Sequence, residues 1–298
     1  MSKLLTPTFP DYELIDSGDF EKLERFGDYV TRRPEPQAIW HKSLDEQQWQ
    51  KMADASFLRT SSSKNEERGE WHTKSHMPDR WQIKYSYKQM HLNMRLGLTS
   101  FKHVGIFPEQ AANWNFIYDQ ITLQRQSGVQ PKVLNLFAYT GGATLAARSA
   151  GADVTHVDSV KQVITWSREN MENSHLEGVR WIVEDALKFV RREVRRGNKY
   201  DGIILDPPAY GRGANGEKWV LEENICEMLE CCAELLEKDH GFLVLNLYSM
   251  GLSALLARTA LRQTFGNTGS EEMGELYFTD RMGKELPLGT FCRFTRKK

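Results

Sequence analysis

The segment Asp206-Pro207-Pro208-Ala209-Tyr210 places a carboxylate, two prolines and an aromatic ring directly after a predicted apolar strand. Proline fixes φ and lacks a backbone N–H, so the turn is rigid and we expect its carbonyl oxygens to be free. These carbonyls and the Asp206 carboxylate would accept hydrogen bonds from an amino or ring N–H group of a planar molecule, and Tyr210 would stack on it. In the alternative interpretation, the prolines only end the strand.

A pair of adjacent glycines, Gly141 and Gly142, stands between another predicted strand and a helix. Glycine has no Cβ, so a ligand can approach its backbone closely. The free N–H groups at the start of the following helix suit a carboxylate. The stretch does not match the G-x-G-x-x-G pattern, which disfavours a nicotinamide dinucleotide. Considered alone, two glycines are most often a simple turn.

Acidic residues follow the next two predicted strands. Asp158 lies 17 residues after Gly141, where a carboxylate can accept hydrogen bonds from the hydroxyls of an adenosine ribose. Asp185 is placed to accept one from an adenine amino group, although an aspartate before a helix is also an ordinary N-cap. The glycine pair, Asp158 and Asp185 follow successive strands in this order, and together they indicate a nucleoside-binding site more specifically than either acid alone.

These residues are positioned by a regular alternation of strands and helices after residue 110. The sequence predicts strands over 133–137, 154–157, 179–183, 200–205 and 242–247, and closing strands at 275–278 and 291–295. It predicts helices over 111–126, 143–150, 160–173, 186–196, 217–238 and 253–265. Such alternation implies an α/β fold whose mostly parallel sheet carries helices on both faces. Ligands bind such sheets at the carboxyl ends of the strands.

The first 110 residues differ in residue pattern from the rest of the chain. Short β-like stretches at 12–15, 29–31, 81–87 and 92–98 predict a small β-rich module, a candidate for substrate binding. The polar segment 59–80 is predicted to be a loop, or a segment ordered only by a partner. We therefore divide the chain into a module over 1–110 and a second domain over 111–298.

The composition disfavours a membrane span, a metal site and binding that depends mainly on nucleic-acid phosphates. The chain has no apolar run of about 18 residues and no apolar signal-peptide core, so we expect a cytoplasmic protein without a membrane span. None of the four cysteines forms a C-x2-C pair, which disfavours a metal site. The net charge of −1 gives little support to binding dominated by nucleic-acid phosphates.

Two local patterns have an RNA-binding and a structural interpretation. Aromatic residues alternate with basic ones over 71–88, a mixture that suits single-stranded RNA or, equally, the aromatic core of a β module. The basic cluster over 191–199 is interpreted as the solvated end of a helix, where cations are favoured.

Several motifs together resemble the S-adenosylmethionine (SAM)-dependent methyltransferases of the 23S ribosomal RNA large-subunit methyltransferase family, in the subgroup without a PUA domain. The resemblance rests on residues 135–142, 156–159, 170, 185 and 204–208, with further likeness upstream at 101–114 and, for the N-terminal module, at 14–18 and 23–27. It implies a Rossmann-like class I sheet of seven strands, SAM as cofactor and ribosomal RNA as substrate. The implied catalytic residues are Asp206, Pro207, Pro208 and Tyr210. The implied cofactor-binding residues are Phe107, Gln110, Asn135, Phe137, Ala138, Tyr139, Thr140, Gly141, Gly142, Asp158, Ser159, Asn170, Asp185 and Asp206, with Lys102 as a further candidate.

The resemblance also bears on the acceptor atom. Relatives that methylate cytosine at C5 use a cysteine after the fifth strand, and residues 245–250 (LNLYSM) contain none. Attack on pyrimidine C6 needs a thiolate, so transfer to nitrogen is favoured over carbon. Three alternatives stay open: transfer to a small molecule or a protein side chain, SAM binding without catalysis and, last, an NAD-linked oxidoreductase.

Overall fold

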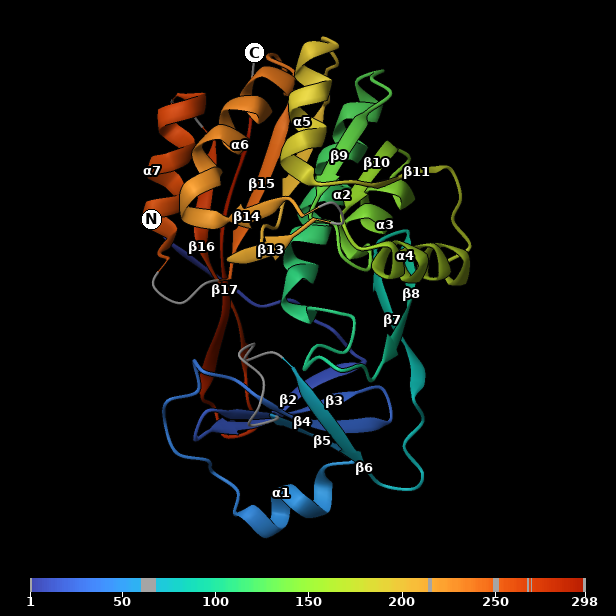
Figure 1. The fold of residues 1–298 in the computed structure, drawn as a ribbon, viewed down its shortest axis with the longest axis vertical. Helices are drawn as coiled ribbons and strands as arrows, with labels where there is room; N and C mark the ends of the chain where they lie inside the picture. The colour runs from blue at the N-terminus through green and yellow to red at the C-terminus, as the bar shows by residue number, and fades with distance from the viewer. Residues whose placement is uncertain are drawn as a thin grey trace.

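The computed structural model describes residues 2–59, 68–213, 216–248, 252–266, 268 and 270–296. It has two parts, a large sheet flanked by helices and a smaller β-rich module at one end of it (Figure 1).

The large sheet has strand order β1-β16-β17-β15-β12-β9-β10-β11. The strands are β1 (Lys3–Leu5), β9 (Lys132–Leu136), β10 (Asp153–Asp158), β11 (Val179–Val183), β12 (Gly202–Leu205), β15 (Phe242–Leu247), β16 (Glu271–Thr279) and β17 (Glu285–Thr295). The strands from β15 to β11 are mutually parallel, and β17 runs antiparallel to both β15 and β16. The predicted α/β class with a mostly parallel sheet is confirmed.

An eighth strand corrects the predicted number of seven. Strand β1 pairs parallel with β16, so residues 3–5, which the prediction assigned to the N-terminal module, lie in the large sheet. Only three residues long, β1 has no periodicity that a sequence could reveal. Close approach makes the pairing possible, because a Cβ at Gly274 would lie 1.7 Å from the Lys3 carbonyl oxygen.

Helices cover both faces of this sheet. They are α2 (Ala111–Gln126), α3 (Gly142–Ser149), α4 (Lys161–Asn173), α5 (Ala186–Arg195), α6 (Leu221–Leu235) and α7 (Ala254–Phe265). Alternate strand residues enter two apolar clusters: Val133 packs with α2 and α3, whereas Leu134 packs with α5, α6 and α7. This alternation explains why the central strands β9, β12 and β15 are mostly apolar, since both of their faces are buried.

The helix predicted over 217–238 begins later than expected. Residues Lys218–Val220 form β14, which pairs antiparallel with β13 (Tyr210–Arg212), and α6 starts at Leu221. The Asn224 side chain accepts a hydrogen bond from the Val220 backbone N–H at 2.9 Å and so fixes the start of the helix.

The N-terminal module contains a five-stranded sheet, a short helix α1 (Glu46–Met52) and a hairpin. The sheet consists of β2 (Tyr12–Gly18), β3 (Glu21–Phe26), β4 (Tyr29–Pro34), β5 (Ala55–Arg59) and β6 (Gly69–Thr73). Strand β6 corrects the loop predicted over 59–80, of which residues 60–67 lie outside the described part. The polar strand β6 is compatible with its place at the edge of the sheet, where one side remains exposed.

The hairpin of β7 (Arg80–Tyr87) and β8 (Met90–Gly97) decides between the two interpretations of the aromatic residues. Trp81 and Tyr85 are buried in the cluster that contains α2 and α3, whereas Arg80 and Lys84 are exposed. The buried rings form core contacts, and Tyr85 packs edge-on against Trp114 at 5.6 Å between ring centroids. The aromatic-core interpretation is therefore right for these two residues.

A buried aspartate joins the two parts of the molecule. The β16–β17 hairpin reaches from the large sheet down to the small one (Figure 1), and Lys284 beside its turn donates to Asp16 at 2.8 Å. Asp16 is fully buried and also accepts from Trp49 Nε1 at 2.8 Å and from the Leu44 N–H at 2.9 Å. Burial raises the pKa of Asp16, but Lys284 and these donors outweigh it and hold the pKa below its ordinary value.

We expect Asp16→Asn to lower the free energy of unfolding at pH 7 by about 2–4 kcal/mol, because it breaks a buried ion pair and leaves donors unsatisfied. Because its pKa is lowered on folding, the ionised Asp16 stabilises the folded protein above about pH 4, and this stabilisation is lost as the pH falls. The difference in the free energy of unfolding between the wild type and Asp16→Asn should therefore be smaller at acidic pH. Urea unfolding at pH 7 and pH 3.5 measures both effects. An unchanged deficit at the lower pH would contradict the electrostatic cause.

Candidate active site

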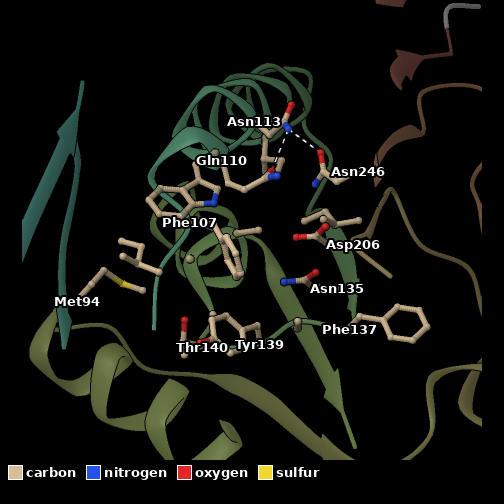
Figure 2. Close-up of a pocket in the computed structure, with 18 residues that line it drawn as sticks. Met94, Phe107, Gln110, Asn113, Asn135, Phe137, Tyr139, Thr140, Asp206 and Asn246 are labelled. Atoms are coloured by element: carbon tan, nitrogen blue, oxygen red, sulfur yellow. Dashed lines mark hydrogen bonds between the residues drawn. The ribbon is translucent and has the colours of Figure 1, made fainter. Parts of the chain in front are cut away.

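A pocket opens at the carboxyl ends of β9 and β12 and is covered by the segment that leads into α2 (Figure 2). It brings together ten of the predicted residues, from three separate parts of the chain. These are Phe107, Gln110, Asn135, Phe137, Ala138, Tyr139, Thr140, Gly141, Gly142 and Asp206. The position is the one that parallel α/β sheets use for ligands, since strand ends diverge there and leave a crevice.

The loop after β9 has a constrained backbone. Phe137 and Tyr139 have φ values of 55° and 48°, and Gly141 has 92°. Non-glycine residues in this region carry strain that the surroundings must hold in place. Asp158 Oδ2 accepts from the Tyr139 N–H at 3.0 Å, and Thr140 Oγ1 donates to the Gly105 carbonyl oxygen at 2.7 Å. The loop is thus held in one shape before any ligand binds.

The start of α3 is open to a ligand. Gly141 is its N-cap and makes no side-chain capping bond, so the first N–H groups of the helix have no capping side chain. Gly142 packs so closely on α2 that a Cβ there would lie 2.3 Å from Trp114 Cζ2. Free helix N–H groups beside a bare backbone fit the carboxylate end of an amino acid such as the methionine part of SAM.

Asp158 ends β10 next to this loop but does not line the pocket. Its oxygens accept from the N–H groups of Tyr139 and Val160, at 3.0 and 2.9 Å, and burial raises its pKa. A carboxylate has about four lone-pair positions, so capacity remains for a ribose hydroxyl. The ribose roles of Asp158 and its neighbour Ser159 stay predictions.

Two other predicted residues lie outside the pocket lining. Asp185 caps α5 by accepting from the Lys188 N–H at 2.9 Å, as the alternative interpretation expected. Asn170 is fully buried, and its amide donates to the Thr140 carbonyl at 2.9 Å and accepts from the Arg95 N–H at 2.8 Å. Asn170 therefore positions the loop. Contacts of Asp185 or Asn170 with a cofactor remain predictions.

Asp206 stands at the end of β12 and faces the pocket (Figure 2). In the described part of the chain, its carboxylate has no hydrogen bond or ion pair. Burial raises the pKa of Asp206 to about 6. A carboxyl with such a pKa can accept a proton near neutral pH, which is the property that a general base needs.

One of the two proline carbonyls departs from the expectation that both are free. The Pro208 carbonyl oxygen accepts from Trp219 Nε1 at 2.7 Å, so it is already occupied. The reason is the β13–β14 hairpin, which brings Trp219 back over the turn. Pro207 is buried, and Tyr210 is 50% exposed with its hydroxyl accepting from Arg212 Nε at 2.8 Å. Neither Pro207 nor Tyr210 lines the pocket, and their roles stay predictions.

Sequence reasoning missed a polar group beside Asp206, on the neighbouring parallel strand. Asn246 near the end of β15 accepts from Asn113 Nδ2 at 2.8 Å, and Asn113 also contacts Gln110 at 3.1 Å and Arg293 at 3.0 Å. An asparagine inside the apolar strand FLVLNL was a signal that we did not use. The other unpredicted lining residues are Met94, Ile106, Trp114, Ile117, Ala143 and Ile204.

Comparison with known proteins identifies the family. A crystal structure described as a SAM-dependent methyltransferase from Agrobacterium tumefaciens matches 99% of this chain and 94% of its own, with 38% identity and a TM-score of 0.89. The chain belongs to the SAM-dependent methyltransferases. Its cofactor is therefore SAM. A family described as "Conserved hypothetical protein 95" matches residues 112–239 of this methyltransferase.

More distant relatives match this chain at lower sequence identity. The ribosomal RNA large subunit methyltransferase K/L of Shewanella frigidimarina is 29% identical over 156 residues, which is 51% of this chain and 21% of that protein. The methyltransferase thus spans about a fifth of that relative's length. A putative methyltransferase, SMU.776, complexed with SAH shares the fold at 17% identity, with a TM-score of 0.71, over 97% of this chain and 76% of its own.

Three further features bear on other kinds of function: the basic cluster on α5, the grouping of metal-binding side chains and the length of the apolar helices. The basic cluster on α5 is paired with acids, including Arg191 with Glu227 and Arg192 with Glu184, as expected for a solvated helix end. Among the described residues, no three His, Cys, Asp or Glu side chains are grouped to hold a metal ion. No helix in the described ranges is long and apolar enough to span a membrane.

Proposed function

We propose that this methyltransferase modifies a nitrogen atom of a ribosomal RNA base. The observation that carries the proposal is Asp206, whose carboxyl faces the cofactor pocket, has no hydrogen bond or ion pair among the described residues, and has a pKa that burial raises to about 6. When a base N–H or amino group is methylated, a proton must leave the nitrogen. Asp206 is the group within the pocket that can take it.

SAM, when bound, supplies an electrophilic methyl group on a sulfonium. The chain then has to align the acceptor and exclude water. Asp206 would accept the proton at a carboxylate oxygen. Asn246, whose Nδ2 has no partner in the described part of the chain, would donate to a ring nitrogen or carbonyl of the acceptor.

The cysteines support nitrogen over pyrimidine C5. Segment 245–250 has none, and the four that exist, Cys226, Cys231, Cys232 and Cys292, do not line the pocket. Residues 249 and 250 of that segment lie outside the described part. Burial raises the pKa of Cys292 to about 12 and that of Cys232 still further above its ordinary value, so these two do not form the thiolate that C5 chemistry needs.

The RNA substrate is inferred from relatives. Proteins named as ribosomal RNA large subunit methyltransferases recur among them, including the Shewanella protein and a putative one from Methanocaldococcus jannaschii that is 31% identical over 116 residues. A small molecule or a protein side chain is the second candidate, because the net charge of −1 gives no general attraction to phosphates.

The test is mass spectrometry of nucleosides from ribosomal RNA of wild-type cells and of cells that lack this protein. We expect one N-methylated nucleoside to fall in amount in the deletion strain and to return on complementation. Loss of a 5-methylpyrimidine would contradict nitrogen chemistry. An unchanged nucleoside profile would contradict the RNA substrate and favour the second candidate.

A further inference from the structure

A chain of three buried polar side chains leads from the cofactor pocket into the layer between the sheet and α3. Asn135 on β9 lines the pocket (Figure 2), and its Nδ2 donates to Thr144 Oγ1 on α3 at 2.9 Å. Thr144 Oγ1 in turn lies 2.9 Å from Nδ1 of His156 on β10. The three residues are at most 2% exposed, so water cannot replace these hydrogen bonds and each partner fixes the next.

The histidine sets the direction of the hydrogen bonds in this chain. Burial lowers the pKa of His156 to about 3, so near pH 7 its ring is neutral and has one acceptor nitrogen. With Nδ1 as the acceptor, the Thr144 hydroxyl donates to His156 and accepts from Asn135. With Nδ1 protonated, the hydroxyl proton would have no acceptor among the described residues, and the Nε2 lone pair would also be unsatisfied. The first arrangement leaves fewer polar groups without partners and is therefore favoured.

This direction decides which end of the Asn135 amide faces the cofactor pocket. Because Nδ2 is bonded to Thr144, Oδ1 is the free end, and it has no hydrogen bond among the described residues. Asp206, which follows the neighbouring strand β12 and also faces the pocket, provides further acceptor oxygens. This part of the pocket thus presents acceptors, which suit a ligand group that carries N–H donors and a positive charge.

SAM has such a group next to its carboxylate. The free N–H groups at the start of α3 suit the carboxylate, and the α-ammonium is attached to the same carbon atom. Thr144 is in the first turn of α3, so its bond to Asn135 holds the amide beside those N–H groups. We propose that Thr144 and His156 are positioning residues, which hold Asn135 Oδ1 toward the α-ammonium of SAM.

The experiment is calorimetric titration of the full chain with two ligands. One is S-adenosylhomocysteine, the product that SAM leaves after transfer, and the other is its des-amino analogue, which lacks the ammonium. We expect Thr144→Val to weaken binding of S-adenosylhomocysteine about tenfold, because a hydrogen bond to a charged group is lost, and to weaken binding of the analogue less than about twofold. Thr144→Ser, which keeps the hydroxyl, should restore the affinity for S-adenosylhomocysteine to within about threefold of the wild type.

The matched control is Thr155→Val. Thr155 is buried and adjoins His156 on β10, but successive residues of a strand point to opposite faces of the sheet. Thr155 therefore lies away from the cofactor pocket, whose lining does not include it. Its substitution removes a buried hydroxyl of the same kind and should leave the affinity for both ligands unchanged.

The two ligands separate positioning from a general disturbance of the fold. An equal loss of affinity for both ligands in Thr144→Val, or no loss for S-adenosylhomocysteine, would overturn the proposal. If the melting temperature shows that Thr144→Val does not fold, Thr144→Ala, which removes the hydroxyl without adding a methyl group, is judged by the same comparison. RNA takes no part in the measurement, so its result is independent of the proposed acceptor.

Discussion

Asp206→Asn is expected to lower methyl transfer by at least about a hundredfold while making the folded protein more stable above pH 6. The amide is nearly isosteric but cannot accept the proton, and general bases contribute about 10²–10⁴ in rate. SAM affinity should change less than turnover. Single-turnover transfer to the natural RNA, followed across pH 5–8, measures the effect. The wild-type rate should rise with pH through about 6, because only the ionised carboxylate accepts a proton.

The stability gain follows from the raised pKa. Burial shifts the pKa of Asp206 from 3.8 to about 6, so ionisation is unfavourable in the folded state. The protein loses stability as the pH rises from about 4 to 6, and a shift of two units corresponds to at most about 3 kcal/mol. Because the carboxylate faces a pocket and is partly solvated, we expect about 1–2 kcal/mol of stabilisation from Asp206→Asn at pH 8.

Urea unfolding of both proteins at pH 8 and pH 4 checks the sign, since the gain should vanish at pH 4. Asp185→Asn is a useful comparison, because Asp185 caps a helix and asparagine caps nearly as well. A destabilised Asp206→Asn protein at pH 8, or one with wild-type turnover, would show that Asp206 has another role.

Gly142→Ala is expected to weaken SAM binding by at least about tenfold and to destabilise the fold by about 1–3 kcal/mol. The added methyl would lie 2.3 Å from Trp114 Cζ2, so α3 must move away from α2 and take the loop of residues 137–141 with it. Calorimetric titration with SAM and thermal unfolding measure the two effects.

The control for this substitution is Gly289→Ala on β17. Its Cβ would meet nothing closer than 3.9 Å, and the glycine has no positive φ. Combining Gly142→Ala with Trp114→Phe, which removes the obstructing part of the ring, should recover part of the SAM affinity. No recovery, or an equal loss in Gly289→Ala, would contradict a steric cause.

The elements that build the cofactor pocket were predictable because each follows from local sequence. Strands β9, β10, β11 and β12 are short and rich in apolar residues, and Asp158, Asp185 and Asp206 lie at or just after the carboxyl ends of β10, β11 and β12. Because helices connect these strands in parallel, their carboxyl ends lie side by side at one edge of the sheet. Gly141, Gly142 and Asp206 meet in one pocket for this reason, although their contacts with SAM remain proposals.

What could not be predicted depends on contacts between distant segments. Asn113 and Asn246 are 133 residues apart and form one wall of the pocket by a hydrogen bond of 2.8 Å. The occupied Pro208 carbonyl depends on Trp219, which returns through a hairpin that the helical pattern of the region concealed.

The most direct test of the account is reconstitution with purified protein. Ribosomal RNA from cells that lack the protein is incubated with labelled SAM, digested to nucleosides and analysed by mass spectrometry. We predict one labelled nucleoside with the methyl group on nitrogen, formed by the wild type and not by Asp206→Asn. A label on carbon or oxygen, or a label found in protein and absent from RNA, would contradict the account.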